Sequence, residues 1–113
     1  MDQPIPFAAF EAVEIRAGTV VDAQPFPEAR KPALRLWLDF GAPIGVKRSS
    51  AQVTARYAPA ALLGRQVLAV VNLAPRQVGP FVSEVLVLGV ADADGAVVLV
   101  GPDQPVPNGS RMH

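Results

Sequence analysis

Side chains able to bind a polyanion gather in one short stretch of this chain, residues 46–56. They are Lys47, Arg48, Ser49, Ser50, Gln52 and Arg56. Successive side chains of a strand point to opposite faces, so Arg48, Ser50 and Gln52 share one face. Hydroxyls and amides beside basic groups can bind phosphate and ribose hydroxyls together, which recognises the shape of an RNA more than its sequence. Alternatively, the charges are only solvated and the serines bond to their own strand edge.

A second polar group interrupts the apolar run VLAVV at Asn72 and continues through the turn APRQVG, residues 74–79. The amide of Asn72 has a donor edge and an acceptor edge, which can pin this turn or bind a base or a peptide backbone. Arg76 lies between a stiffening proline and Gly79, a residue suited to positive φ. The guanidinium of Arg76 can fork onto phosphate or stack on a base, or it can simply keep the surface soluble.

Aromatic side chains supply a third set of candidate contacts. Trp37 lies on the polar face of the alternating segment ALRLWLDFG, which favours packing in an interface or a secondary cluster over a stacking platform for a base. Four other rings lie in expected loops or extensions: Phe7, Phe10, Phe26 and Phe81. They could cover the fold, build a dimer or line a groove for an extended peptide. We assign these five rings to peptide binding or to a dimer interface.

Groups that could assemble a catalytic site are scarce. The sequence has no cysteine, its single histidine is His113, and Glu84 opens an apolar strand without a second convergent carboxylate. It also shows no glycine-rich phosphate loop and no metal-ligand spacing. We therefore predict that the protein is not an enzyme and has no catalytic residue, metal site or cofactor.

Charge is unevenly distributed along the chain, although the formal net charge is zero. Residues 30–76 carry eight basic side chains against one acid, a net charge of +7. Residues 1–29 carry −4 and residues 77–113 carry −3. If folding gathers the basic residues on one face, that face attracts phosphate; the alternative is a solvated surface of mixed charge.

The elements that must position these residues are short strands. Twelve prolines and nine glycines punctuate the chain, as is typical of an all-β barrel or sandwich. Strands are expected in six segments: 12–23, with a bulge or bend at Gly18, then 33–41, 46–53, 65–73, 83–91 and 95–102. The strands over 65–73 and 83–91 are apolar on both faces and should be covered on both.

One segment, residues 54–64, breaks this pattern. Thr54 can cap one helical turn, Pro59 suits the first turn of a second short helix, and Gly64 suits its left-handed C-terminal cap. Three strands, a helix and two further strands form the order of an OB-fold, a five-stranded Greek-key barrel whose exposed strands and loops bind oligonucleotides.

The length of the chain favours one hydrophobic core. We expect a single domain, 1–113, with a core of about 13–100 and terminal extensions outside it. Asp2 and two prolines stand where a signal peptide needs a basic and then an apolar stretch. No apolar run approaches the roughly 20 residues of a membrane span. Together with the absence of cysteine, these features predict a cytoplasmic protein without membrane insertion.

Three stretches in order, IRAGTVVDAQPFPEARKPALRLWLDFG, KRSSAQVTARY and VVNLAPRQVGPFVSEVLVLG, resemble the CsaA family. This family comprises small tRNA-binding-domain proteins described as chaperones linked to protein export. The sequence is more distantly similar to the tRNA-binding modules of methionyl- and phenylalanyl-tRNA synthetases. The resemblance implies an OB-fold barrel, a homodimer built with the terminal extensions, and affinity for tRNA and for unfolded or export-bound polypeptides.

The sequence departs from the wider tRNA-binding modules after Ser83. Those modules have glycine and methionine where this chain has Val85 and Leu86, while Ser83 itself matches. The branched Val85 opposes a close approach of RNA to the backbone, and the departure favours the chaperone branch. Chemistry and resemblance together assign RNA binding to Lys47, Arg48, Ser50, Gln52, Arg56, Asn72, Arg76 and Ser83.

These observations lead to one functional hypothesis with two alternatives. We expect a tRNA-binding OB-fold protein that acts as a dimeric, ATP-independent, export-related molecular chaperone. The alternatives are an RNA-binding module with no chaperone role, and a structural subunit of a larger assembly.

Overall fold

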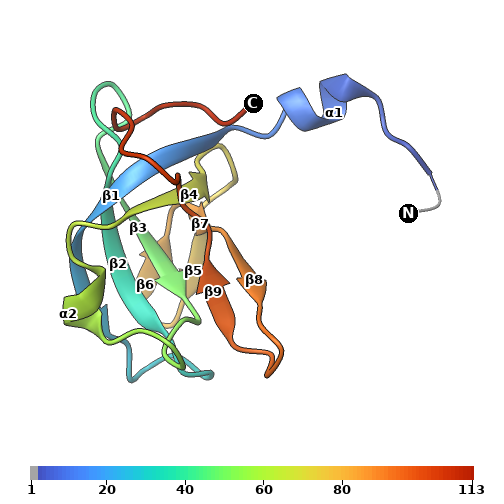
Figure 1. Ribbon diagram of the computed structural model, residues 1–113. Coiled ribbons are helices and arrows are strands. Elements are labelled where there is room, and N and C mark those ends of the chain that lie inside the picture. Colours follow the sequence, from blue (N-terminus) through green and yellow to red (C-terminus); the bar gives the residue numbers. More distant parts are fainter. Residues whose placement is uncertain (1–2) are drawn as a thin grey trace.

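The computed structural model describes residues 3–113, and their arrangement is shown in Figure 1. The elements of this part of the chain are α1 (Phe7–Glu11), β1 (Ile15–Pro25), β2 (Leu34–Asp39), β3 (Val46–Ala51), α2 (Pro59–Leu62), β4 (Gln66–Val70), β5 (Arg76–Val78), β6 (Phe81–Ser83), β7 (Leu86–Val87), β8 (Gly89–Ala91) and β9 (Val97–Leu99). One antiparallel sheet has the strand order β3-β2-β1-β4-β7, while β5–β6 and β8–β9 form separate hairpins.

The sheet curls into a nearly closed barrel. Its two ends meet where the backbone oxygen of Arg48 in β3 accepts hydrogen bonds from the amides of Glu84 and Val85, at 2.8 and 3.2 Å. The expected helix between the third and fourth strands is α2, and Gly64 after it has a φ of 84°. The predicted five-stranded barrel with one short helix in this position is confirmed. We expected one helical turn at Thr54, but residues 54–56 form a non-helical turn.

The alternating pattern of β2 builds the centre of the core. Leu36, Leu38 and Phe40 are each 0% exposed and pack with Leu34 and the inward side chains of β1 and β4. Burial of a side chain of this size stabilises the fold by about 1.5–3 kcal/mol. Trp37, on the opposite face of β2, is only half-buried. The inward and outward faces that we predicted for this strand are therefore correct.

Gly18 in β1 serves close packing. The bulge that we expected at Gly18 lies further along the strand, because the register with β2 shifts between Val20 and Asp22. A Cβ atom on Gly18 would come within 2.7 Å of the Phe40 ring. The strand therefore needs glycine here to make room for a core aromatic side chain.

The chain after β4 is more broken than the sequence predicted. We expected one strand over residues 83–91, covered on both faces, whereas the structure divides it into the end of β6, β7 and β8. The strand is divided at Leu88. The amide of this residue donates to the Leu68 carbonyl in β4, whereas its carbonyl accepts from the Val100 amide, just after β9. Leu86 and Val90 are 48% and 61% exposed, so the prediction of two covered faces is wrong for this chain.

The two terminal extensions meet beside the start of β1, as Figure 1 shows. The N-terminal extension contains α1, a helix that we did not predict, and it buries none of its residues. The C-terminal segment runs along β1, where Ala17 donates to the Ser110 carbonyl at 2.9 Å and accepts from the Gly109 amide at 2.8 Å. Both extensions are thus anchored to the same end of the barrel.

Candidate functional site

A groove of about 1030 Å³ opens beside the end of β3. Its walls come from the β1–β2 loop, the end of β3, the β5–β6 hairpin and the segment from β7 to β9. Its polar lining includes the basic side chains of Arg30, Lys31 and Arg76, the acidic side chains of Glu28 and Glu84, and the neutral polar side chains of Ser50, Gln52, Gln77 and Ser83. Its apolar lining includes Leu73, Val85, Leu86, Val87, Val97 and Leu99. The groove is therefore amphipathic, and its volume is at the upper end of the range for ligand pockets.

Four residues predicted to bind RNA meet in this groove: Ser50, Gln52, Arg76 and Ser83. The backbone amide of Ser50 donates to Ser83 Oγ at 3.0 Å, which ties β6 to β3. Gln52 and Arg76 are exposed. Ser83 therefore shapes the groove, while Gln52 and Arg76 present polar groups to a ligand.

Arg30 and Lys31 are site residues that we did not select from the sequence. They belong to the β1–β2 loop and line the same groove as Arg76. Within residues 3–113, none of these three cations has an acidic group at ion-pair distance. The sequence did contain a signal, because Arg30 and Lys31 open the basic middle segment in a proline-bounded loop. We call Arg30, Lys31 and Arg76 the basic rim.

Arg48 and Lys47 lie outside the groove lining. Arg48 Nε lies 3.3 Å from Glu84 Oε1, and the guanidinium stacks over the Phe81 ring at 5.4 Å. Lys47 is half-buried and pairs across the sheet with the core residue Leu38. The strand alternation thus separates these two basic residues from each other, as predicted, and the fold separates both from the basic rim.

Arg56 is neutralised by two acidic side chains from the β8–β9 turn. Its Nε lies 2.8 Å from Asp92 and its Nη2 lies 3.0 Å from Asp94. The hydrogen bond to Asp92 raises the pKa of Arg56 above its ordinary value, and the same bond lowers the pKa of Asp92. The basic middle segment therefore does not form one continuous positive face, because acids from the last third of the chain pair with part of it.

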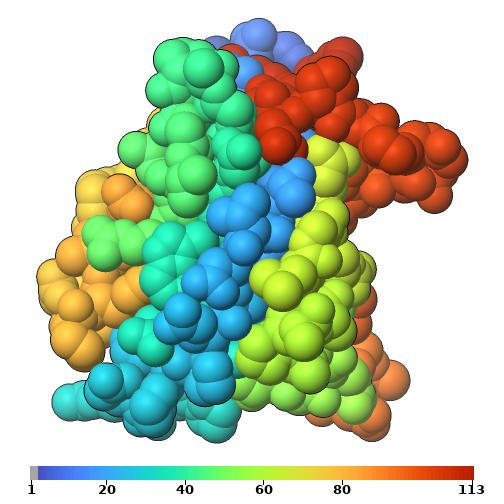
Figure 2. Space-filling model, turned by 90° about the vertical axis from the view of Figure 1, so that its left-hand side faces the viewer, coloured from blue at the N-terminus to red at the C-terminus, as the bar shows by residue number. Residues whose placement is uncertain are grey.

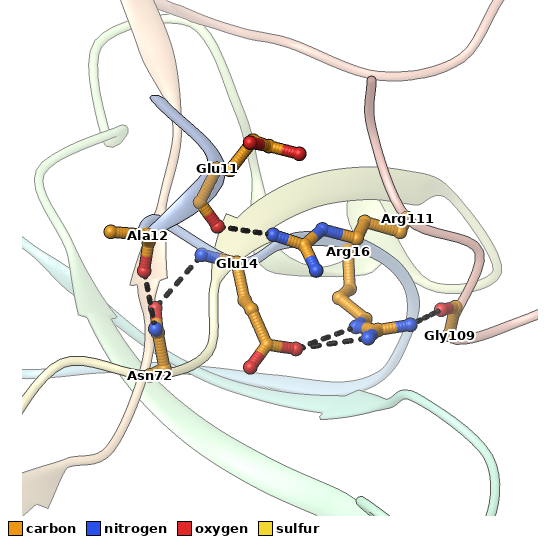
Figure 3. Close-up of polar contacts among 7 residues, drawn as sticks. All are labelled: Glu11, Ala12, Glu14, Arg16, Asn72, Gly109 and Arg111. Atoms are coloured by element: carbon orange, nitrogen blue, oxygen red, sulfur yellow. Dashed lines mark hydrogen bonds and ion pairs between the residues drawn. The ribbon is translucent and has the colours of Figure 1, made fainter. Parts of the chain in front are cut away.

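Asn72 uses both edges of its amide to hold the N-terminal extension (Figure 3). Its Oδ1 accepts from the Glu14 amide at 2.9 Å, and its Nδ2 donates to the Ala12 carbonyl at 2.8 Å. Of the alternatives drawn from the sequence, internal pinning is the one observed. The pinned segment is the N-terminal extension, whereas we had expected the turn that follows Asn72, and part of that turn forms β5.

Arginine side chains fasten the same region from the other side. Arg16 bonds to the Glu14 carboxylate at 2.9 Å and to the Gly109 carbonyl at 2.9 Å. Arg111 in the C-terminal segment donates to the Glu11 carbonyl at 2.5 Å. Figure 3 shows these contacts converging on the few residues between α1 and β1. The guanidinium groups of Arg16 and Arg111 therefore link the N-terminal and C-terminal extensions to each other.

Three of the predicted interface rings form a cluster on the outer face of β2. Phe26 and Phe81 are 3% and 6% exposed, and Phe81 meets both Phe26 and Trp37 edge to face at 5.5 and 5.8 Å. Figure 2 shows the hairpin β5–β6, in light orange, lying against β2 in cyan. We predicted that Phe26 and Phe81 bind a peptide or a second subunit, but both rings are buried within the chain, where they cover the barrel. We expected Trp37 in either an interface or a secondary cluster, and within the chain it packs against Phe81.

The remaining two rings lie on α1 and face a different environment. Phe7 is 69% exposed and Phe10 is half-buried, with their centroids 5.8 Å apart. Ile5 before them is 71% exposed. The N-terminal extension thus displays an apolar surface, which we call the α1 patch and define as Ile5, Phe7 and Phe10.

Metal ligands and membrane-spanning helices were both expected to be lacking, and residues 3–113 bear on each. No cluster of three or more histidine, cysteine or acidic side chains in that range could hold a metal ion. None of its helices has the length and apolar character needed to cross a membrane. The groove itself presents hydroxyls, amides, cations, the carboxylates of Glu28 and Glu84, and aliphatic side chains.

Comparison with known proteins places this geometry in a family. Residues 15–111 match the family model described as "Putative tRNA binding domain". The structure of chaperone CsaA from Bacillus anthracis is 48% identical, with a TM-score of 0.92 over 98% of this chain and 100% of that one. The CsaA chaperone protein of Picrophilus torridus is 42% identical, with a TM-score of 0.90 over 97% of this chain and 100% of that one.

Curated relatives include methionine–tRNA ligases, which this chain matches over a small part of their length. The ligase of Methanothrix thermoacetophila is 41% identical over 110 residues, and that of Flavobacterium johnsoniae is 33% identical over 109 residues. Each match covers 96% of this chain but only 16% and 15% of the ligases. The prediction of a non-catalytic protein is supported, because the shared part is the small binding domain and the CsaA matches are complete. The chain belongs to the tRNA-binding-domain family, as a non-catalytic member of the CsaA type.

Proposed function

We propose that this protein binds folded tRNA through the basic rim of the groove. The observation that carries the proposal is the convergence of Arg30, Lys31 and Arg76, from two separate segments, on one groove. Within residues 3–113 no acidic side chain pairs with these cations, so their charge is available to phosphate. Gln52 adds an amide that can bind ribose or phosphate beside them.

Recognition of RNA shape fits this groove better than base stacking does. Among its described lining residues there is no aromatic side chain, because Phe26 and Phe81 are buried and Trp37 packs against Phe81. Stacking of unpaired bases depends on such rings. Contacts to phosphates and ribose hydroxyls do not, and they suit a folded RNA. Lys47, Arg48, Arg56 and Asn72 lie away from the basic rim, and we leave them out of the proposed site.

A titration of labelled total tRNA tests this proposal. We expect saturable binding at low salt, and a large loss of affinity when Arg30, Lys31 and Arg76 are all replaced by glutamine. Arg56→Gln is the matched control, because its charge is already compensated by Asp92 and Asp94 and it should bind nearly as well as the original protein. Equal losses in the two variants would show that RNA does not use the basic rim.

A second function, holding unfolded or export-bound polypeptide, is favoured by the apolar part of the groove. Leu73 and Leu86 both line it and are 49% and 48% exposed, so aliphatic surface is available inside the groove for an apolar segment of a partner. We propose that the protein acts in this way as an ATP-independent, export-related chaperone in the cytoplasm. An equimolar amount should suppress aggregation of a chemically unfolded client without ATP, and Leu73→Ser with Leu86→Ser should reduce this effect while Val90→Ser, exposed but outside the groove lining, should not.

Dimerisation through the terminal extensions is part of the same proposal. The α1 patch is exposed, while the backbone behind it is anchored by Asn72 and Arg111, so it is presented in a fixed place. A second copy of the chain could cover it. Light scattering should report twice the chain mass, and Phe7→Ser should shift the protein toward the monomer. A mass unchanged by this substitution would remove the α1 patch from the interface.

A further inference from the structure

Two strand edges with unused backbone groups border the groove. In β3, the backbone groups that face away from β2 belong to Arg48 and Ser50, and then to Gln52 just past the strand end. Glu84 and Val85 donate to the Arg48 carbonyl, and the Ser50 amide donates to Ser83. The Ser50 carbonyl and both backbone groups of Gln52 have no hydrogen-bond partner within residues 3–113. The edge of β3 is thus closed as far as the Ser50 amide and open from the Ser50 carbonyl onward.

The second open edge belongs to β8. Hydrogen-bonded and non-hydrogen-bonded pairs alternate along antiparallel strands. The Asp92 amide donates to Ala96 and the Val100 amide donates to Leu88, so the residues in between that face away from β9 are Gly89 and Ala91. Neither of these has a backbone hydrogen bond elsewhere in the described part of the chain. Gly89 itself lines the groove.

The surface between these edges matches an extended polypeptide. Alternate side chains of a strand point to one face, and here that face would meet the aliphatic lining of the groove, which includes Val85, Val97 and Leu99. The other side chains would point outward, toward solvent and the basic rim. Unused donors and acceptors on a strand edge are the groups that bind an added strand.

We infer that the groove binds an extended polypeptide as an added β-strand between β3 and β8. The preferred occupant has aliphatic side chains at every second position and acidic side chains between them, which complement the basic rim. This inference rests on the proposed polypeptide-holding function and specifies how the client is held. A backbone-directed mode accepts many sequences, because most of its hydrogen bonds go to groups that every residue has.

An unpaired RNA strand is a poorer occupant of the same space. Its bases would need aromatic rings to stack on, and the described lining has none. Its backbone carries no N–H donors to match the free carbonyls of Ser50 and Gln52. The edges therefore favour polypeptide, whereas the basic rim outside them suits the phosphates of a folded RNA.

Amide hydrogen exchange with a defined peptide tests the inference. The probe is a peptide of about seven residues, with valine and glutamate alternating and both ends blocked, which spans about 20 Å when extended. At saturation, exchange of the Gln52, Gly89 and Ala91 amides should slow by about tenfold or more, because only the free fraction exchanges. The Val21 and Arg56 amides, away from the groove lining, are the controls and should not change. A peptide N-methylated on its valines has the same side chains and should bind at least about tenfold more weakly.

A protein variant gives a second readout. Gln52→Pro removes the free backbone amide together with the glutamine side chain, while Gln52→Ala removes the side chain and keeps that backbone amide. We expect Gln52→Pro to weaken peptide binding at least about tenfold more than Gln52→Ala does, because only the proline variant loses the backbone amide; equal losses would contradict the inference. Suppressed aggregation without amide protection would overturn the inference and leave the holding function standing. No peptide binding and no suppression would overturn both, and protection of these amides by tRNA instead of peptide would assign the edges to RNA.

Discussion

The salt dependence of tRNA binding should change in a defined way when Arg76 is replaced by glutamine. The basic rim offers three cations to phosphate, and with the coefficient of a double-stranded helix each contact contributes about −0.9 to the slope of log K against log salt concentration. Three contacts give a slope of about −2.7, which is about a 40-fold loss of affinity between 50 and 200 mM salt. With two contacts the slope becomes about −1.8, and the loss over the same range falls to about 12-fold.

Fluorescence titration of labelled tRNA at four or more salt concentrations measures this slope directly. Arg56→Gln removes another exposed arginine, one whose charge is already balanced by Asp92 and Asp94, so its slope should stay near −2.7 by the same estimate. The reasoning is refuted if Arg76→Gln leaves the slope unchanged, or if Arg56→Gln lowers it as much. Either result would mean that phosphates lie against a different face of the barrel.

Three further predictions concern the framework of the site. Asn72→Ala should lose about 1–2 kcal/mol of unfolding free energy in urea and expose the N-terminal extension to protease, while Asn72→Asp, which keeps one hydrogen bond, should lose about half as much; equal losses would contradict the two-bond account. Gly18→Ala should cost about 1–3 kcal/mol because its Cβ meets Phe40, and Phe40→Leu in the same chain should recover part of it. The hydrogen bond from Arg56 lowers the pKa of Asp92, so the contribution of this ion pair to stability is complete above the ordinary pKa of 3.8 and is lost as pH falls through the lowered pKa; a carboxylate titration by NMR should show this lowered pKa, and Arg56→Gln should raise it toward the ordinary value.

The sequence pattern within a single strand or helix was enough to predict features that depend on that element alone. The alternation of β2 predicted that Leu36 and Leu38 face the core and that Trp37 faces outward, because side chains of a strand alternate regardless of its neighbours. The helix at Pro59 followed from turn and cap chemistry that acts within a few residues. The order of these elements, together with the motifs, was enough to predict the barrel and the family.

Only the tertiary structure decided which polar residues share a surface. Arg48 and Arg56 looked equivalent to Arg76 in the sequence, but acidic side chains 36 or more residues away neutralise the first two. Arg30 comes to lie on the same groove as Arg76 because the β1–β2 loop folds beside the β5–β6 hairpin.

For Asn72, the sequence predicted the kind of contact but not the partners. Its residue type indicated two hydrogen bonds, yet the partners, Ala12 and Glu14, come from an extension 58–60 residues earlier in the chain. The sequence by itself determined the barrel, its core face and the absence of catalytic chemistry, since these depend on composition and short-range periodicity. The groove, its basic rim and its open strand edges arise from contacts between distant segments, which only the folded chain brings together.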